Sequence, residues 1–445
     1  MSFPRYLAYK DSGVEWLGEV PGHWDVKRLK QACHVFPSNV DKKSYDGETP
    51  VKLCNYTDVY YNDNDTIAAK TDFMAATATQ EQIAKFTLRA GDTIITKDSE
   101  TADDIAIAAY VPEDLPGVIC GYHLSMIRPT QATSGAFVKR LFDSSYVKSC
   151  VAVRAKGLTR VGLGQYEIDN LDLPFPPLPE QTQIAAFLDR ETAKIDALVA
   201  EQRRLMALLK EKRQAVISHA VTKGLDPDAP MKPSGIEWLE EVPAHWDIGR
   251  MASVFAEVAD PGTDDLPILS VSIHHGISDK EMDDEKLDRK VTRSDDRSKY
   301  KKVLPGDLVY NMMRAWQGGF GTVMVAGMVS PAYVVARPKV PTDTAYIEHL
   351  LRTPQAIEQM RRHSRGITDF RLRLYWDEFK NLAVVMLPLQ EARAICAEIA
   401  EMGNRFAELT ASCQESIDLL QERRTALISA AVTGKIDVRG TVSIL

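Results

Sequence analysis

The chain has 445 residues, of which 44% are hydrophobic and 26% are charged, and its formal net charge is −8. This length exceeds one ordinary core and predicts two or three domains in a folded, soluble protein. No apolar run reaches the roughly 18 residues of a membrane span, and the N-terminus lacks the apolar core of a signal peptide. We therefore expect a cytoplasmic protein without a membrane partner. The six scattered cysteines form no C-x-x-C pair, which argues against a zinc site.

The charges are unevenly distributed. Residues 257–288 hold ten acidic and two basic side chains, so this segment alone accounts for the net charge. Residues 139–160 carry six Lys or Arg against one acid, and residues 352–373 carry six Arg against two acids. Such clusters favour phosphate binding, although one basic run alone is more often a solvated helix face.

The first predicted element is a Trp-rich motif at residues 12–26, SGVEWLGEVPGHWDV. It predicts a turn with a short helix or strand, whose indole rings pack against the domain. The motif returns at residues 234–248 as SGIEWLEEVPAHWDI, with eleven of fifteen positions identical. A second repeat, RQAVISHAVT at 213–222 and RTALISAAVT at 424–433, closes each half. The chain is therefore an internal repeat with shared ends and divergent middles.

The middle of each half reads mostly as strands, because its Val-, Ile- and Tyr-rich segments are broken by Gly, Pro and Asp. Weak repeats also occur there: GDTII at 91–95 resembles GDLVY at 306–310, and KGLTR at 156–160 resembles RGITD at 365–369. The predicted strands lie at residues 93–96, 118–127, 171–175, 266–273, 308–312, 321–336 and 382–387.

A long helix is predicted from about residue 180 to 221, after the prolines at 174, 176, 177 and 179. Seven of ten positions in two heptad series are apolar, which indicates a coiled-coil seam. Those series are Leu188, Ile195, Gln202, Leu209 and Val216, with Ile184, Glu191, Leu198, Leu205 and Lys212 as the partner series. After Pro388 the series are Ile399, Phe406, Cys413, Leu420 and Leu427, with Ile395, Met402, Leu409, Ser416 and Arg423 as partners.

These elements predict an α+β fold with two β-rich modules, each followed by a long helix. The two helices most simply pair with each other, although a homodimer would also satisfy the seam. A helix of about 40 residues is about 60 Å long, which corresponds to some 18 base pairs of duplex. The expected domains are 1–179, 180–223, 224–388 and 389–445.

Candidate DNA-reading residues lie in loops of the divergent middles. Arg pairs with guanine, Asn and Gln pair with adenine, and Lys and Ser position phosphates. In the first half the candidates are Asn55, Tyr56, Lys97, Ser99, Tyr122, His123, Thr159 and Arg160. In the second half they are His274, His275, Arg314, Trp316, Gln317, Tyr333, Arg365, Thr368, Arg371 and Arg373.

Catalytic motifs are missing. The sequence has no G-x-x-x-x-G-K-[ST], no G-x-G-x-x-G and no H-E-x-x-H. The run Pro174-Phe175-Pro176-Pro177 fits a stiff joint better than a methyltransferase loop, and the Asp-rich segments fit solvated loops better than a metal site. We therefore expect a binding protein that is not itself an enzyme and holds no metal.

The order of motifs resembles that of Type I restriction–modification specificity subunits over essentially the whole chain. The resemblance is carried by KDSGVEWLGEVP at 10–21 with His23-Trp24, by its repeat at 232–246, and by LP-x-PPLPEQ at 173–181. The second joint departs from this pattern, because residues 387–391 read LPLQE.

The resemblance implies two target recognition domains that each read one half of a split site in double-stranded DNA. It implies two conserved helical regions that pair as an antiparallel coiled coil and set the spacing between the half-sites. Two modification subunits would hold S-adenosylmethionine and methylate adenine. Two restriction subunits, which use ATP and Mg, can join to translocate and cleave DNA. This chain would bind none of these cofactors itself.

A different class of function also fits the pattern. A coiled-coil scaffold with two β-rich, protein-binding modules would show the same repeat and the same long helices. Salt distinguishes the two hypotheses, because binding dominated by phosphate contacts weakens by orders of magnitude as salt rises.

Overall fold

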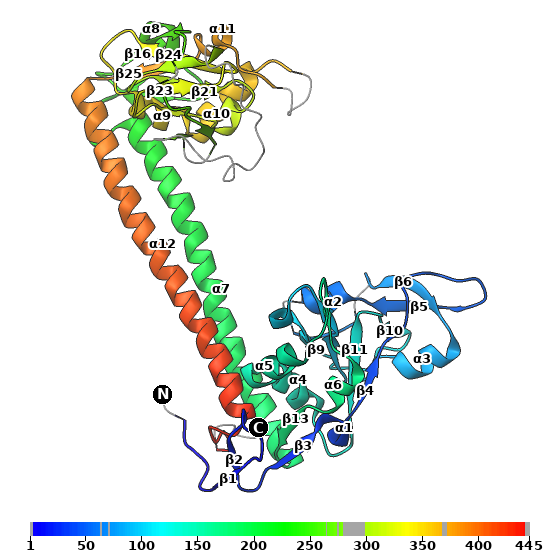
Figure 1. Cartoon of the computed structure of the whole chain (residues 1–445). Coiled ribbons are helices and arrows are strands. Elements are labelled where there is room, and N and C mark those ends of the chain that lie inside the picture. The colour runs from blue at the N-terminus through cyan, green and yellow to red at the C-terminus, as the bar shows by residue number, and fades with distance from the viewer. Residues whose placement is uncertain are drawn as a thin grey trace. The chain divides into compact units, whose positions relative to one another are not determined.

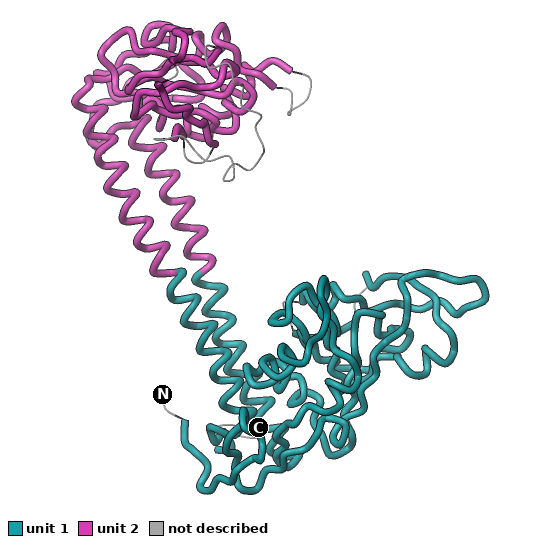
Figure 2. Tube along the Cα trace, viewed as in Figure 1, with its two compact units in different colours: residues 1–202, 414–445 teal, residues 203–413 magenta. Residues whose placement is uncertain are grey.

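The computed structural model describes residues 3–62, 65–69, 72–263, 265–273, 276–278, 299–366 and 372–440. The chain forms two compact units (Figure 2). Unit 1 comprises residues 1–202 and 414–445, and unit 2 comprises residues 203–413. Unit 2 is therefore inserted into unit 1 along the sequence.

Each unit contains one copy of the Trp-rich motif, which folds into a hairpin followed by one more strand (Figure 1). The third strand pairs antiparallel with the strand that precedes the long helix, so the motif and the helix entry are joined. In unit 1 the strands are β1 (Tyr9–Asp11), β2 (Glu19–Pro21), β3 (Asp25–Arg28) and β13 (Asp172–Phe175). In unit 2 they are β14 (Met231–Pro233), β15 (Glu241–Pro243), β16 (Asp247–Arg250) and β25 (Ala383–Met386).

Each middle contains a four-stranded antiparallel sheet, with the order β4-β11-β7-β9 in unit 1 and β17-β24-β21-β22 in unit 2. These strands are β4 (Cys33–Pro37), β7 (Thr93–Thr96), β9 (Ala108–Tyr110), β11 (Leu124–Pro129), β17 (Phe255–Val258), β21 (Leu308–Asn311), β22 (Phe320–Thr322) and β24 (Tyr333–Pro338). The smaller strands are β5 (Thr49–Cys54), β6 (Met74–Ala78), β8 (Asp98–Ser99), β10 (Val118–Cys120), β12 (Val161–Gly162), β18 (Val271–Ser272), β19 (Gly276–Ile277), β20 (Lys301–Val303) and β23 (Gly327–Val329).

The GD repeat predicted from the sequence leads into the central strand of each sheet. Asp92 and Asp307 are buried, and each is held by an arginine of the neighbouring strand, Arg128 or Arg337. Two nitrogens of each guanidinium donate to the carboxylate, which is the fork geometry that favours Arg at buried ion pairs. The short sequence repeat thus reflects a repeated internal ion pair.

The middles also contain helices that the sequence reading missed. A pair of helices covers the sheet in each unit: α4 (Gly135–Asp143) and α5 (Ser145–Arg154), and α9 (Thr344–Leu351) and α10 (Pro354–His363). Ser and Thr side chains cap α4, α5 and α10. The shorter helices are α1 (Leu29–Ala32), α2 (Tyr56–Tyr60), α3 (Gln80–Phe86), α6 (Gln165–Asp169), α8 (Met251–Val254) and α11 (Trp376–Phe379), with single 3₁₀ turns η1 (Ala102–Asp104) and η4 (Ala315–Gln317).

The two long helices are α7 (Leu178–Lys223) and α12 (Leu389–Val432). Each unit contains one segment of both, and the two segments run antiparallel. In unit 1 Arg424 pairs with Asp196, whereas Ile428 shares a core with Ile184, nearer the start of α7. In unit 2 Val221, near the end of α7, shares a core with residues at the start of α12. The predicted antiparallel seam is confirmed within each unit.

In the partner series of the predicted seam, part of the buried positions lies one residue further along the helix than predicted. Leu198 is 52% exposed and Leu205 is 42% exposed, whereas Val199 is buried. On α12 Leu409 is 51% exposed and Ile417 is buried. Both helices carry leucines on their outer faces, so hydrophobicity alone did not show which leucine faces the partner.

A glutamate in the first turn of each long helix binds the Trp-rich motif. Glu180 accepts hydrogen bonds from the indole of Trp24 and the hydroxyl of Tyr6, and lies 2.7 Å from His23 Nε2. In unit 2 Glu391 accepts from the indole of Trp246 and lies 2.8 Å from His245 Nε2. The prediction that the indoles pack inside holds for these two tryptophans, which are fully buried.

The first tryptophan of each motif behaves differently from the second. Trp16 is 57% exposed, contrary to the expectation, and Trp238 is partly buried against the core of unit 2. Only the second indole lies beside the glutamate of the long helix, and it therefore carries the fixed contact of the motif.

Each long helix ends at a glycine in the left-handed region, Gly224 with φ +81° and Gly434 with φ +74°. Each glycine packs against the proline and the buried tryptophan of its own unit's motif, Pro243 and Trp246 or Pro21 and Trp24. A side chain at Gly434 would come within 2.3 Å of Pro21, so only glycine fits there. In each unit the chain leaves the long helix through a joint of the same kind.

Candidate nucleic-acid interface

In unit 1 several strand ends meet at one edge. Strands β7 and β11 are antiparallel with Thr96 opposite Leu124, so Lys97 and His123 are adjacent and share a backbone hydrogen bond. Strands β5 and β10 are parallel and end together at Cys54 and Cys120. The residues that follow these ends, which include Asn55, Tyr56 and Tyr122, therefore lie near Lys97.

Strand β12 adds a fourth loop to this edge. It pairs with β8, with Val161 opposite Ser99 and Gly162 opposite Asp98. The loop that holds Thr159 and Arg160 is thereby placed beside the residues after β7. The structure thus brings together all eight residues that the sequence singled out in the first half. Whether they bind DNA remains a prediction. We call this set, together with Asp98, the unit 1 loop cluster.

Asp98 is the centre of the unit 1 loop cluster. Its Oδ2 lies 2.7 Å from His123 Nδ1, and its Oδ1 lies 3.0 Å from Arg160 Nη2. The Asp98 side chain is 18% exposed, whereas that of Arg160 is 50% exposed. The sequence analysis named both contact partners of Asp98, His123 and Arg160, as candidate DNA-reading residues but did not include Asp98 itself. The role of Asp98 depends on the pairing of β8 with β12, which places Arg160 beside it. No local sequence pattern predicts that pairing.

Lys97 and the two tyrosines are partly engaged within the unit 1 loop cluster. Lys97 Nζ donates to the carbonyl of Ser38 at 2.8 Å and lies 4.3 Å from the centre of the Tyr122 ring. Burial lowers the pKa of Lys97. Burial, followed by the charge of Asp104, raises the pKa of Tyr56, which also hydrogen-bonds Ser99. Because the pKa of Tyr56 is raised, its hydroxyl stays protonated at neutral pH.

The remaining two cluster residues have different surroundings. Asn55 lies next to Gly121, where a side chain would come within 2.8 Å of the Cys54 carbonyl, so glycine permits the close approach of the two strand ends. The Asn55 amide lies 3.1 Å from Met74 Sδ. Thr159 is exposed in the loop that precedes β12. An exposed threonine and an amide at the rim could both contact a ligand.

In unit 2 the described candidates form two smaller groups. Arg314 and Gln317 are exposed at the ends of η4, and the charge of Arg314 acts on Tyr333, whose pKa is raised chiefly by burial. The guanidinium of Arg361 lies 6.0 Å from the Trp316 ring. Arg365 and Arg373 form a backbone bridge beside a hollow of about 800 Å³ that Met313 also lines. The candidates His274, His275, Thr368 and Arg371 lie outside the described residues.

The first two residues of the KGLTR and RGITD segments, Lys156-Gly157 and Arg365-Gly366, occupy equivalent positions in the two units. Lys156 bridges to Gly162 as Arg365 bridges to Arg373, and both loops follow the second helix of a pair. Lys156 pairs with Glu167 of α6, and Arg365 pairs with Glu378 of α11. Gly157 has φ +149° and Gly366 has φ +157°, a conformation that favours glycine. The weak sequence repeat therefore marks a repeated loop frame.

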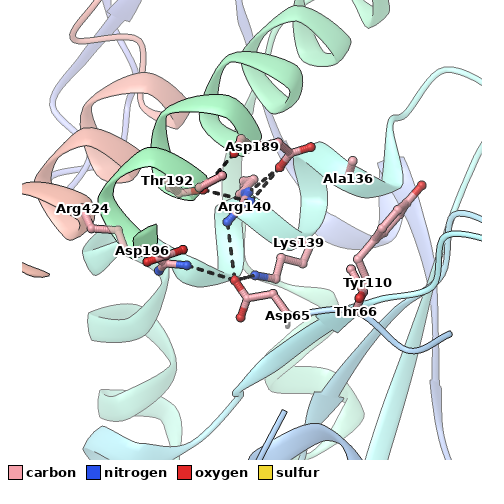
Figure 3. A pocket seen from close by; sticks show the side chains of 11 residues that line it. Asp65, Thr66, Tyr110, Ala136, Lys139, Arg140, Asp189, Thr192, Asp196 and Arg424 are labelled. Atoms are coloured by element: carbon pink, nitrogen blue, oxygen red, sulfur yellow. Dashed lines mark hydrogen bonds and ion pairs between the residues drawn. The ribbon is translucent and has the colours of Figure 1, made fainter. Parts of the chain in front are cut away.

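Part of each basic run does not contribute to a phosphate-binding surface. Lys139 and Arg140 are buried, and Figure 3 shows them at a pocket of about 460 Å³ in unit 1. Lys139 lies 2.7 Å from Asp65, and Arg140 lies 2.6 Å from Asp189. In unit 2 Arg352 pairs with Glu348 and donates to two backbone carbonyls. Internal carboxylates and carbonyls take up these cations, so a count of charges overstated the basic surface.

The described part of the chain shows no group of three or more side chains that could hold a metal ion. Over the same ranges no helix combines the length and the apolar character that crossing a membrane demands.

Comparison with known proteins agrees with this architecture. Residues 21–205 match the family described as the Type I restriction modification DNA specificity domain. A Methanocaldococcus jannaschii protein assigned as the specificity subunit of type I restriction enzyme MjaX is 24% identical over 53% of this chain and 54% of its own length. The Escherichia coli EcoBI specificity subunit is 26% identical over 65% of this chain and 63% of its own length. The chain thus spans about half to two thirds of these relatives.

Solved structures share the fold. A chain from a structure that describes complex assembly and conformational transition of the type I R-M system superposes with a TM-score of 0.64 at 18% identity, over 93% of this chain and 98% of that one. The HsdS subunit from Thermoanaerobacter tengcongensis gives a TM-score of 0.53 at 19% identity, with the same coverage.

The repeated frame and these matches define a class: two-module proteins whose modules are each built on a segment of the same helix pair. Within that class the chain is similar to Type I restriction–modification specificity subunits, whose family model matches its residues 21–205.

Proposed function

We propose that this chain reads DNA sequence on behalf of a Type I restriction–modification complex. The observation that carries the proposal is the repeated frame with unlike loops. Both units share the hairpin, the Asp–Arg fork, the tethered loop and the glutamate that binds the buried indole, whereas their exposed loop residues differ. A shared frame suits a common partner, and differing loops suit two different target sequences.

The proposed division of labour follows from the two units. Each unit reads one half of a bipartite site in double-stranded DNA, unit 1 through its loop cluster and unit 2 through the loops around Arg314 and Arg365. Two modification subunits, which bind S-adenosylmethionine, methylate adenine, and restriction subunits with ATP and Mg cleave. The chain itself is not an enzyme and directs where its partners act.

Electrostatics adds an expectation about assembly. Many of the basic residues are engaged in internal ion pairs, and the net charge is −8. Because phosphate contacts dominate the affinity of proteins for DNA, the isolated chain should bind DNA weakly. Partner subunits would then supply most of the phosphate contacts, and this chain would supply the contacts to bases.

The test is to co-express the chain with a cognate modification subunit and to map methylated adenines across the host genome by single-molecule sequencing. We expect a split motif with a fixed gap and a methylated adenine in each half. Duplex binding by the complex should fall steeply between about 50 and 200 mM salt. If no motif depends on the chain and binding is insensitive to salt, the alternative of a protein-binding scaffold is favoured.

A further inference from the structure

We propose that Arg160 determines sequence specificity in unit 1: its guanidinium, oriented by Asp98, reads a guanine in the half-site that this unit contacts. This inference deepens the proposed function and rests on it.

Arg160 is accessible to a ligand in unit 1. The Arg160 side chain is 50% exposed, at the tip of a loop that is fixed at its base by the Lys156–Gly162 bridge. A side chain at Gly157 would lie within 1.9 Å of the Arg160 carbonyl oxygen, so the loop folds tightly around this residue. Arg160 is therefore a projecting group on a defined backbone.

The guanidinium of Arg160 lies beside Asp98. Asp98 Oδ1 lies 3.0 Å from Arg160 Nη2, yet no donor is aligned with this oxygen in the described structure. The contact is thus an ion pair rather than a hydrogen bond. Oδ2 of the same carboxylate is occupied by His123. Asp98 is consequently engaged on both sides and acts as a positioning residue rather than as a reader of bases.

The charge beside Arg160 bears on whether it contacts a base or a phosphate. The Asp98 carboxylate offsets the positive charge of Arg160, which weakens its attraction for a phosphate. It leaves intact the planar fork, and two parallel N–H groups match the O6 and N7 acceptors of guanine in the major groove. A guanidinium restrained beside a carboxylate therefore suits guanine better than the DNA backbone.

A separate observation comes from the sequence of the second unit. When KGLTR at 156–160 is aligned with RGITD at 365–369, the position of Arg160 corresponds to Asp369. A residue that only stabilised the loop would tend to keep its charge in both copies. Opposite charges at aligned positions of the repeat are expected where two modules read different bases.

The experiment uses the full chain in complex with its modification subunit. The motif mapped for the wild type is placed in synthetic duplexes, and each base pair of both halves is replaced in turn. Arg160→Lys, which keeps the charge but loses the fork, should lose about tenfold to hundredfold discrimination at a single G·C pair. Its salt dependence of binding should match that of the wild type. Arg160→Gln should show the same loss at the same pair.

Positioning by Asp98 is tested separately. Asp98→Asn should relax discrimination at the same base pair as Arg160→Lys, and Asp98→Glu should restore part of it. A purely structural role would instead lower affinity for every duplex equally. The matched control is Arg89→Lys, since Arg89 is exposed in the same module but precedes β7, whereas Lys97 and Asp98 follow it. This control should leave every base preference unchanged.

Two results would overturn the inference while leaving the proposed function intact. One is a wild-type motif that Arg160→Lys and Arg160→Gln read with unaltered preference at every position. The other is a uniform loss of affinity across all duplexes, which would mean a phosphate contact. A wild-type complex that directs methylation to no motif would count against the proposed function itself.

Discussion

Glu180 and Glu391 perform the same task with different surroundings. Glu180 is 7% exposed at its side chain and is contacted by Tyr6, His23 and Trp24. Glu391 is 28% exposed, and among the described residues its side-chain partners are His245 and Trp246. A buried donor that loses its acceptor costs more free energy than an exposed one, since water can replace the lost partner. The two sites are therefore a natural matched pair.

We predict that Glu180→Ala lowers the free energy of unfolding by about 2–4 kcal/mol, because it strands two buried donors. Glu391→Ala should cost about 1–2 kcal/mol, because its site is more open. Denaturant unfolding of the full chain, followed by tryptophan fluorescence, measures both changes. If both variants lost the same free energy of unfolding, the difference in burial between the two sites would not determine the cost.

The sequence could identify side chains with suitable binding chemistry, but it could not show what surrounds each of them in the folded protein. It pointed to Lys97, Ser99, Tyr122 and His123, and these lie together. It gave no reason to choose Asp98, because its partners come from 25 and 62 positions away in the chain. It also could not show that Lys139 is buried, since a basic run looks the same whether its carboxylate partners are near or absent.

At the level of elements, Asp65 joins a loop to two helices of unit 1. Its carboxylate lies 2.7 Å from Lys139 of α4 and 3.1 Å from Arg424 of α12 (Figure 3). Burial alone would raise the pKa of Asp65, but Lys139 and Arg424 outweigh that effect and hold the pKa below its ordinary value. The loop is thus tied electrostatically to the helix pair.

Acid should weaken this tie. Because the pKa of Asp65 is lower in the folded state, its stabilising effect is present above its unfolded pKa of about 4 and is lost as pH falls through the folded pKa. We predict that Asp65→Asn lowers stability by about 1–2 kcal/mol at pH 7, less than for a fully buried pair because Asp65 is partly exposed. Thermal melts of both proteins should converge as the pH falls below the folded pKa of Asp65. A constant difference across pH would assign the effect to packing.

The tethered loop offers a second test at this level. Gly157→Ala should distort the loop, because the new methyl group would meet the Arg160 carbonyl oxygen at 1.9 Å. We expect relaxed preference in one half of the target with little change in Tm, since the loop is exposed. Gly162→Ala, whose methyl would lie 3.7 Å from the Lys97 carbonyl oxygen, is the matched control and should behave as wild type. Methylation mapping of both variants provides the measurement.

The sequence predicted the elements that carry a long heptad repeat. It did not predict the elements that depend on tertiary contacts. Heptads predicted α7 and α12 over some 40 residues each, and the strand at 93–96 was placed correctly. The single strand predicted at 118–127 is instead β10 and β11, separated by a turn at Gly121. Within the predicted strand at 266–273, only β18 forms. Helix α4 was missed because the buried cations Lys139 and Arg140 interrupt its apolar face.

For the whole molecule, the proposed function makes helix length a variable of recognition. Inserting one heptad into both long helices, after Gln202 and after Cys413, preserves the seam and lengthens each by about 10.5 Å. We predict that the gap in the methylated motif grows by about three base pairs, while both half-site sequences stay the same. A heptad added to α7 alone would break the antiparallel register and should abolish a defined motif. An unchanged gap in the double insertion would exclude a ruler role for the helices.

The joints after the long helices carry a topological consequence. The backbone of Asp437 donates to Pro4, and the Tyr9 hydroxyl donates to Gly434, so the last described segment runs onto the first strand. Gly224 leads into β14 in the same way, but with a covalent connection. The order of elements is therefore cyclic. The segment after α12 returns to the first strand, just as the segment after α7 leads to β14. A circular permutant opened between 224 and 231, with its old ends linked, should keep both units and exchange only which one is inserted into the other.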